Sequence, residues 1–264
     1  MNFELSVAEL ENLLRLAIAA SEEACAAILE VYNSNNFETE LKGDNSPLTL
    51  ADKKSHEVIE RHLKATGIPI LSEEGKDIPY EARKNWHRLW LVDPLDGTKE
   101  FIKRNGEFTV NIALIENQQP ILGVVAVPVT GEVFFGGIGL GVTKRSRNSK
   151  FEIQDLKSKQ SEILNFESGI RVVASRSHMN DETKAFIEKL GPTEIISAGS
   201  SLKFMLLAEG KADIYPRFGP TLEWDTAAAH AILNALGLSL KKTDGGEELK
   251  YNKENLLNPY FIAG

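Results

Sequence analysis

The stretch Leu89-Trp-Leu-Val-Asp-Pro-Leu-Asp-Gly-Thr98 joins a short apolar run to two closely spaced carboxylates. The apolar half is typical of a buried β-strand. Pro94 has no N–H and a fixed φ, so the strand cannot simply continue past it as a regular member of the ladder. Asp93 and Asp96 would then lie together where the strand ends, and their repulsion favours a cation between them. An all-oxygen ligand set favours Mg2+ over zinc.

The same residues also have two interpretations that need no metal. Asp96-Gly97 lies between two apolar runs, and such a pair is a strong signal for a β-hairpin turn. Asp96 could equally be the N-cap of a short helix through Phe101. This stretch alone leaves all three interpretations open.

The composition is that of a globular protein of one large or two moderate domains. The chain has 264 residues, of which 42% are hydrophobic and 26% charged. Its formal net charge of −8 argues against a general affinity for nucleic acid or anionic lipid. Cys25 is the single cysteine, which excludes a disulfide within the chain and fits a reducing compartment. No secretory signal and no apolar run of membrane-spanning length is found, so we expect a cytoplasmic protein without an integral membrane segment.

Hydrophobic periodicity predicts an α/β protein. Helices are expected at residues 7–32, 50–64, 181–190, 201–209 and 226–236. Strands are expected at residues 38–42, 68–71, 89–92, 108–115, 121–128, 133–136, 170–174, 194–197 and 212–215. The glycines between residues 136 and 141 follow a strand but open no helix, so they predict a hairpin and not a phosphate loop.

The polar segment 144–168 is the best candidate for a boundary between two halves. We therefore expect an α+β half that carries the metal site at residues 1–145. An α/β half that carries the substrate site would follow at residues 146–264. The two would form one compact unit, with the site at their interface.

Four acidic residues follow predicted strands or open a predicted helix. They are Glu74, Asp93, Asp96 and Asp225. Each alone has a structural explanation as a turn residue or a helix cap. Loops at the carboxyl ends of neighbouring strands converge on one edge of a sheet, and four carboxylates there need cations to coexist.

Several segments resemble the motifs of one phosphatase family. Glu73-Glu74, Asp93-Pro-Leu-Asp-Gly-Thr98 and Trp224-Asp225 resemble, in order and spacing, those of the inositol monophosphatase superfamily of Mg2+-dependent, lithium-sensitive phosphatases. Three further segments resemble its CysQ-type 3'(2'),5'-bisphosphate nucleotidases: Ser175-Arg-Ser-His178, Gly199-Ser-Ser-Leu-Lys203 and Tyr215-Pro-Arg-Phe-Gly-Pro-Thr221. The resemblance implies a layered sugar-phosphatase-like α+β fold with alternating α/β/α/β/α layers.

The resemblance also implies a metal and water-activating site. Glu74, Asp93 and the carbonyl of Leu95 would hold one Mg2+, and Asp93, Asp96 and Asp225 a second, with two or three ions per site. Asp52 would pair with Thr98 to orient and deprotonate the attacking water, so the implied catalytic residues are Asp52, Glu74 and Thr98. Metal pairs of this kind clamp both oxygens of an in-line phosphoryl displacement.

Substrate contacts are implied for residues that can bind phosphate and ribose. They are Gly97, Thr98, His178, Ser200, Ser201, Lys203, Arg217 and Asp225. Ser200 and Ser201 could instead cap the following helix, and Lys203 could be a surface charge.

The function that the resemblance implies is removal of the 3'-phosphate from adenosine 3',5'-bisphosphate (PAP), giving AMP and phosphate in sulfur metabolism. It leaves open a second reaction, PAPS to APS, and a peripheral position on the cytoplasmic face of the inner membrane. The alternatives are an inositol or sugar monophosphatase and, from another class, a non-catalytic nucleotide sensor, which would not need the water-activating pair. The only expected partner is the small nucleotide substrate, and the chain could be a monomer or a homodimer.

Overall fold

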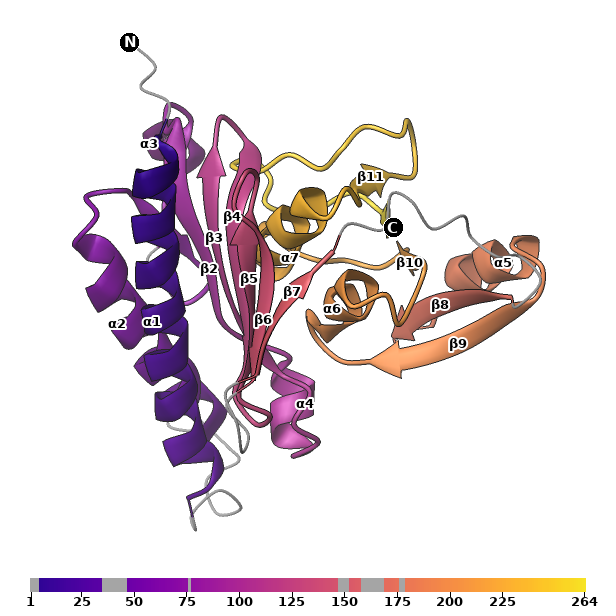
Figure 1. The fold of residues 1–264 in the computed structure, drawn as a ribbon, viewed down its shortest axis with the longest axis horizontal. Coiled ribbons are helices and arrows are strands. Elements are labelled where there is room, and N and C mark those ends of the chain that lie inside the picture. The colour runs from indigo at the N-terminus through magenta and orange to yellow at the C-terminus, as the bar shows by residue number, and fades with distance from the viewer. Residues whose placement is uncertain (1–4, 35–46, 76, 147–151, 158–168, 176–178) are drawn as a thin grey trace.

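A seven-stranded sheet forms the centre of the molecule (Figure 1). The computed structural model describes residues 5–34, 47–75, 77–146, 152–157, 169–175 and 179–264. The strands run in sequence order across the sheet: β1 (Ile70–Ser72), β2 (Arg88–Asp96), β3 (Thr109–Glu116), β4 (Gln119–Val127), β5 (Glu132–Gly137), β6 (Gly141–Ser146) and β7 (Glu152–Leu156). Only the β1–β2 pair is parallel, so the carboxyl ends of these two strands lie at the same edge.

Helices cover both faces of this sheet (Figure 1). One face carries α1 (Val7–Tyr32) and α2 (Pro47–Lys64), and the other carries α7 (Glu223–Ala235). The remaining elements are α3 (Tyr80–Arg83), α4 (Thr98–Ile102), β8 (Ile170–Ser175), α5 (Asp181–Lys189), β9 (Thr193–Ala198), α6 (Leu202–Ala208), β10 (Tyr215–Arg217), β11 (Leu240–Lys242) and β12 (Phe261–Ala263). None of the described helices is both long and apolar enough to cross a membrane.

The apolar run that opens the site motif is buried on both of its faces. In β2, Leu89 and Leu91 pack in the core beside α7, whereas Trp90 and Val92 pack in the core beside α1 and α2. Successive residues of a strand point to opposite faces, so a strand between two helical layers has no polar side. This explains why the run shows no hydrophobic alternation.

A second, smaller sheet continues the alternation of layers. β8 and β9 pair in parallel, and Val173 of β8 packs with Phe204 of α6 in the core beside α7. The neighbouring Val172 and Ala174 of β8 pack with Ile187 of α5 instead. The layers therefore alternate: α1 and α2, then the seven-stranded sheet, then α6 and α7, then the β8–β9 sheet, and last α5. The layered α/β fold is confirmed.

Pro94 interrupts the ladder, as predicted, but it does not end the strand. β2 pairs with β3 at Asp93↔Asn111 and again at Asp96↔Thr109, with a shift of register between the two pairs. Pro94 lies within this irregularity, where no ladder hydrogen bond is needed from it.

The sequence analysis missed two strands near the predicted boundary: β6 reaches Ser146, and β7 pairs with it beyond a gap in the described residues. Apart from the buried Val142, the described side chains of these short strands are exposed or half-buried, so hydrophobicity did not reveal them. The strand expected at 212–215 lies at 215–217, β11 and β12 were missed, and the strand expected at 38–42 lies outside the described residues. The division into halves at residue 145 stays a prediction.

Gly123 of β4 lies against the backbone of α7, and this contact suggests a first test. A Cβ at Gly123 would lie 2.0 Å from the carbonyl oxygen of Ala228, and no rotation can relieve an overlap with backbone. We expect Gly123→Ala to destabilise the protein by about 3 kcal/mol or more, measured by urea unfolding. The matched control is Gly245→Ala, which adds its methyl group in open space. Equal midpoints for the two variants would contradict this packing of α7.

Candidate metal centre

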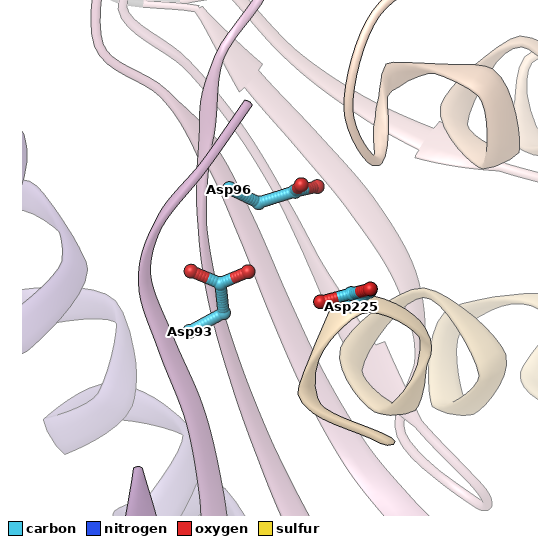
Figure 2. A group of neighbouring side chains, drawn as sticks. All are labelled: Asp93, Asp96 and Asp225. Carbon is cyan, nitrogen blue, oxygen red and sulfur yellow. The ribbon is translucent and has the colours of Figure 1, made fainter. Parts of the chain in front are cut away.

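Three carboxylates from distant parts of the chain meet beside the irregular end of β2. Asp93, Asp96 and Asp225 each place an oxygen so that the three oxygens lie within 4.8 Å of one another. Figure 2 shows these carboxyl groups directed toward a common space, two of them from β2 and one from the first turn of α7. Acidic oxygens gathered in this way form a donor set suited to a hard cation such as Mg2+.

Local hydrogen bonds fix two of the three side chains. The N–H of Leu95 donates to Asp93 Oδ1 at 3.0 Å across the irregular turn of β2. The N–H of Leu222 donates to Asp225 Oδ2 at 2.8 Å, so Asp225 reaches back to the residue before α7 and is not itself the N-cap. The carboxyl groups are therefore held in place by the backbone that carries them.

The first turn of α7 is anchored by a buried charge. The carboxylate of Glu223, which is fully buried, accepts hydrogen bonds from the N–H of Asn252 at 2.5 Å and of Lys253 at 2.9 Å. The Lys253 ammonium adds an ion pair at 2.6 Å. Because Glu223 lies two residues before Asp225, these contacts restrict how far Asp225 can move from the β2 carboxylates.

Proton affinities at this centre are raised by burial and mutual repulsion. Burial raises the pKa of Asp93 well above its usual range, with Asp96 adding the next largest effect. Burial and then Asp96 raise the pKa of Asp225 to about 8. Both causes penalise the charged carboxylate, so without a cation the cluster binds protons at neutral pH.

Of two adjacent glutamates, the structure brings Glu73, the neighbour of the predicted ligand Glu74, into contact with the cluster. Glu73 makes a side-chain hydrogen bond with Asp93, and its pKa is raised by loss of surrounding water and by the charges of Asp96 and Glu74. Both glutamates are exposed at the surface, and the charge of Glu74 acts on Asp52 and on Glu73. The N–H of Glu73 donates to the carbonyl of Val92 at 3.1 Å, so the β1–β2 pairing delivers Glu73 to the centre.

Asp52 lies in α2, on the face of the large sheet opposite to α7, and its charge acts on Asp93 of the cluster. It is buried in α2, and burial followed by the charges of Glu74 and Glu73 raises its pKa to about 8. Ser55, one turn further along α2, donates to the carbonyl of Pro94 at 2.7 Å and joins this helix to the β2 irregularity. Thr98 is exposed at the start of α4, and the structure shows no hydrogen bond between the described side chains of Thr98 and Asp52. Their pairing stays a prediction.

An open cleft of about 610 Å³, including its mouth, adjoins Asp96 and Asp225. Gly97, Ser200, Lys203 and Arg217 also line it, as predicted for substrate-binding residues. Gly97 has a φ of 99°, and a Cβ there would lie 3.2 Å from Ser200 Cβ, so only glycine suits this wall of the cleft.

Three cationic side chains line the cleft, those of Lys99, Lys203 and Arg217, and the last two are the predicted ones. Lys203 is buried beside the ring of Tyr215, and burial lowers its pKa to about 8. It is not a surface charge, and in the described part of the chain its ammonium makes no ion pair. Arg217 donates from Nη2 to the carbonyl of Pro220 at 3.0 Å, but its buried Nε has no partner among the described residues. Such spare donors suit an anionic ligand.

Of the predicted substrate residues that the structure describes, Thr98 and Ser201 do not line the cleft. Ser201 is fully buried and does not line the cleft, so a direct contact with substrate is not supported. Its hydroxyl lies 3.0 Å from Asp96 Oδ2 and 3.1 Å from the carbonyl of Asp225. Neither serine caps α6 through its side chain. His178 lies outside the described residues.

Comparison with known proteins gives one consistent family. The profile of the inositol monophosphatase family matches residues 9–260. A 3'(2'),5'-bisphosphate nucleotidase CysQ of Salmonella typhimurium is 45% identical over 263 residues, covering 96% of this chain and 98% of the relative. The CysQ of Escherichia coli K12 is 46% identical over 246 residues, covering 89% and 92%.

Solved structures agree with this assignment. The crystal structure of CysQ from Bacteroides thetaiotaomicron matches with a TM-score of 0.86 at 46% identity, covering 96% of each chain. An inositol monophosphatase from Anabaena matches with a TM-score of 0.70 at 24% identity, covering 96% of this chain and 90% of that one, which is a likeness of fold alone.

The raised pKa of Asp225 predicts a pH-dependent cost in metal-free protein. The folded carboxyl keeps its proton to about pH 8, whereas an unfolded aspartate loses it near 3.8. The contribution of Asp225 to the free energy of unfolding of the metal-free protein therefore falls as the pH rises from about 4 toward 8. We expect Asp225→Asn to raise the Tm in EDTA by roughly 3 °C or more at pH 8, and by much less at pH 4.5. The exposed Glu254→Gln is the control, and an equal effect of Asp225→Asn at both pH values would refute the repulsion.

Proposed function

The chain belongs to the inositol monophosphatase family, and we propose that it is a 3'(2'),5'-bisphosphate nucleotidase that hydrolyses the 3'-phosphate of PAP to give AMP and phosphate. The observation that carries this proposal is the cleft in which an acidic cluster faces the two cations Lys203 and Arg217. Similarity of 45% to named nucleotidases over almost the whole chain supports the same activity.

We propose that Glu73, Asp93, Asp96 and Asp225 hold the family's Mg2+, with two or three ions per site. Glu73 takes the place that the sequence analysis had given to Glu74, because its carboxyl contacts Asp93. The carbonyl of Leu95 remains in the proposed ligand set. The raised pKa values of these carboxyls support a cation site, since a bound cation removes the repulsion that keeps them protonated.

When bound, Mg2+ supplies positive charge that activates water and stabilises the phosphate oxygens of the transition state. The protein supplies the base and the orientation. Asp52, with a pKa of about 8 in the metal-free protein, lies at the edge of the cluster where it can accept a proton from the attacking water. Thr98, at the start of α4, remains the proposed partner of Asp52.

Substrate choice follows from the cationic side of the cleft. Any phosphate monoester can bind an acidic metal site, so selectivity needs a second set of contacts. We propose that Lys203 and Arg217 bind the 5'-phosphate, and that Ser200 lines the ribose side of the same cleft. An inositol monophosphate has no second phosphate and would leave the buried Lys203 and the free Nε donor of Arg217 without an anionic partner.

Several finer points belong to the same proposal. The buried cations would accept the phosphosulfate of PAPS in place of a 5'-phosphate, which makes PAPS a second candidate substrate. We place the protein in the cytoplasm, where its nucleotide substrates occur, with no nucleic-acid partner in view of the net charge of −8. A monomer or a homodimer would serve this site equally well.

Loss of one cluster carboxylate tests the metal assignment. Asp96→Asn should fold normally, because asparagine keeps the shape of the side chain, and should be nearly inactive with PAP at saturating Mg2+. EDTA should abolish the wild-type activity, and added Mg2+ should restore it. The control Asp244→Asn changes an exposed aspartate. If Asp96→Asn kept more than about a tenth of the wild-type kcat, a loss below ~1.4 kcal/mol, the metal assignment would be wrong.

Three substrates test the selectivity. The kcat/KM of the wild type should be highest for PAP, and lower for 3'-AMP and inositol 1-phosphate by about ten- to a hundredfold, the worth of a charge-assisted contact of roughly 1.5–3 kcal/mol. Arg217→Ala and Lys203→Ala should reduce the rate with PAP more than the rate with 3'-AMP. Equal wild-type values for PAP and inositol 1-phosphate would favour the monophosphatase alternative.

A further inference from the structure

One oxygen of Asp96 is enclosed by polar side chains from two distant segments. Ser201 Oγ lies 3.0 Å from Asp96 Oδ2, and Ser200 Oγ makes a shorter contact with the same atom. Thr109 Oγ1 and Asn111 Nδ2 of β3 each lie 3.5 Å from it. Within the described residues, no hydrogen bond reaches the other oxygen, Oδ1.

The protons of these hydroxyls can be assigned from the distances. A serine hydroxyl has one proton to donate, and Ser200 gives it to Asp96 Oδ2 in its shortest contact. Ser200 Oγ then accepts from Thr109 Oγ1, which lies 2.6 Å away. Thr109, Ser200 and Asp96 form a chain in which each hydrogen bond strengthens the next. With Ser201 as the second close donor, both lone pairs of Oδ2 are occupied.

The backbone at Ser200 makes this double contact possible. Its φ of 49° lies in the left-handed region, which is unusual for serine. This conformation directs two consecutive hydroxyls, those of Ser200 and Ser201, at the same carboxylate oxygen. The Ser201 hydroxyl also lies 3.1 Å from the carbonyl oxygen of Asp225, so its single proton can be shared between two acceptors that belong to cluster aspartates.

We infer that Thr109, Ser200 and Ser201 are positioning residues that hold Asp96 Oδ2 in place, so that Asp96 offers the cation its Oδ1 alone. This inference rests on the proposed function, because the cation is the one that the phosphatase would use. Hydroxyls that fix a ligand carboxylate reduce the reorganisation that metal binding requires, and their loss typically weakens metal binding ten- to a hundredfold. Thr109 and Ser201 act through Asp96, since neither lines the cleft.

The alternative is that the hydroxyls only satisfy buried polar atoms and add to general stability. Ser21 provides the matched control, because it is equally buried and donates to the carbonyl of Ile18 at 2.8 Å within α1. Ser21→Ala and Ser201→Ala remove the same atom from equally buried sites, and α1 contributes no residue to the carboxylate cluster.

The experiment measures binding of Mn2+ to metal-free protein by electron paramagnetic resonance of the free ion, with Mg2+ as competitor. We expect Ser201→Ala and Thr109→Val to weaken Mn2+ binding about tenfold, while Thr109→Ser and Ser21→Ala bind as the wild type does. In the assay with PAP, the Mg2+ concentration for half-maximal activity should rise by a similar factor. The KM for PAP at saturating Mg2+ should change little.

Each outcome bears on one claim. Binding within twofold of the wild type by folded Ser201→Ala and Thr109→Val overturns the positioning role. If Ser201→Ala does not fold, the Thr109→Val and Thr109→Ser pair decides, because β3 keeps its shape in both. A third outcome separates this inference from the proposed function. If Thr109→Val binds Mn2+ more weakly than the wild type, but the wild type hydrolyses no PAP, the proposed function is wrong and the positioning role stands.

Discussion

Repulsion among clustered carboxylates is the constraint on which the rest of this structure depends. Two unit charges at the 4.8 Å spacing of the Asp93, Asp96 and Asp225 oxygens repel by about 3 kcal/mol at an effective dielectric constant near 20. That is a large part of the net stability of a typical domain. The protein can meet this cost by keeping protons or by binding a cation. The raised pKa values show the first solution, and the family's metal dependence supplies the second.

The fold keeps the carboxylates from separating. Asp93 and Asp96 lie on a strand that is packed between helices on both faces, so β2 cannot bend away without opening two cores. Asp225 lies in the first turn of α7, which is anchored through the buried charge of Glu223 and by the close approach of Gly123 to that helix. Rigid elements on both sides therefore hold the three carboxylates together, and a bound cation would relieve their repulsion.

Positively charged side chains line the same cleft as the carboxylates of Asp96 and Asp225. Lys203 is buried without an ion pair among the described residues, and Arg217 has a buried donor without a partner there. A buried cation costs free energy unless a ligand neutralises it, so the cleft is best satisfied by a substrate with two anionic groups. The serines at positions 200 and 201 lie between the two sides and fix the acidic one. In the proposed function, metal affinity and substrate choice therefore have separate physical sources within one cleft.

Local sequence was enough to predict the helices α1, α5 and α7 and the strands from β1 to β5, because periodicity and turn chemistry act over a few residues. It also singled out Asp93, Asp96 and Asp225, whose carboxylates the structure brings together. It could not choose Glu73 over Glu74, since that choice depends on how β1 pairs with β2. Nor could it assign Ser201 to Asp96, which is 105 positions away, or find β6 and β7, whose side chains carry no apolar pattern. These features depend on strand register and on packing between remote segments, and only the tertiary structure decides them.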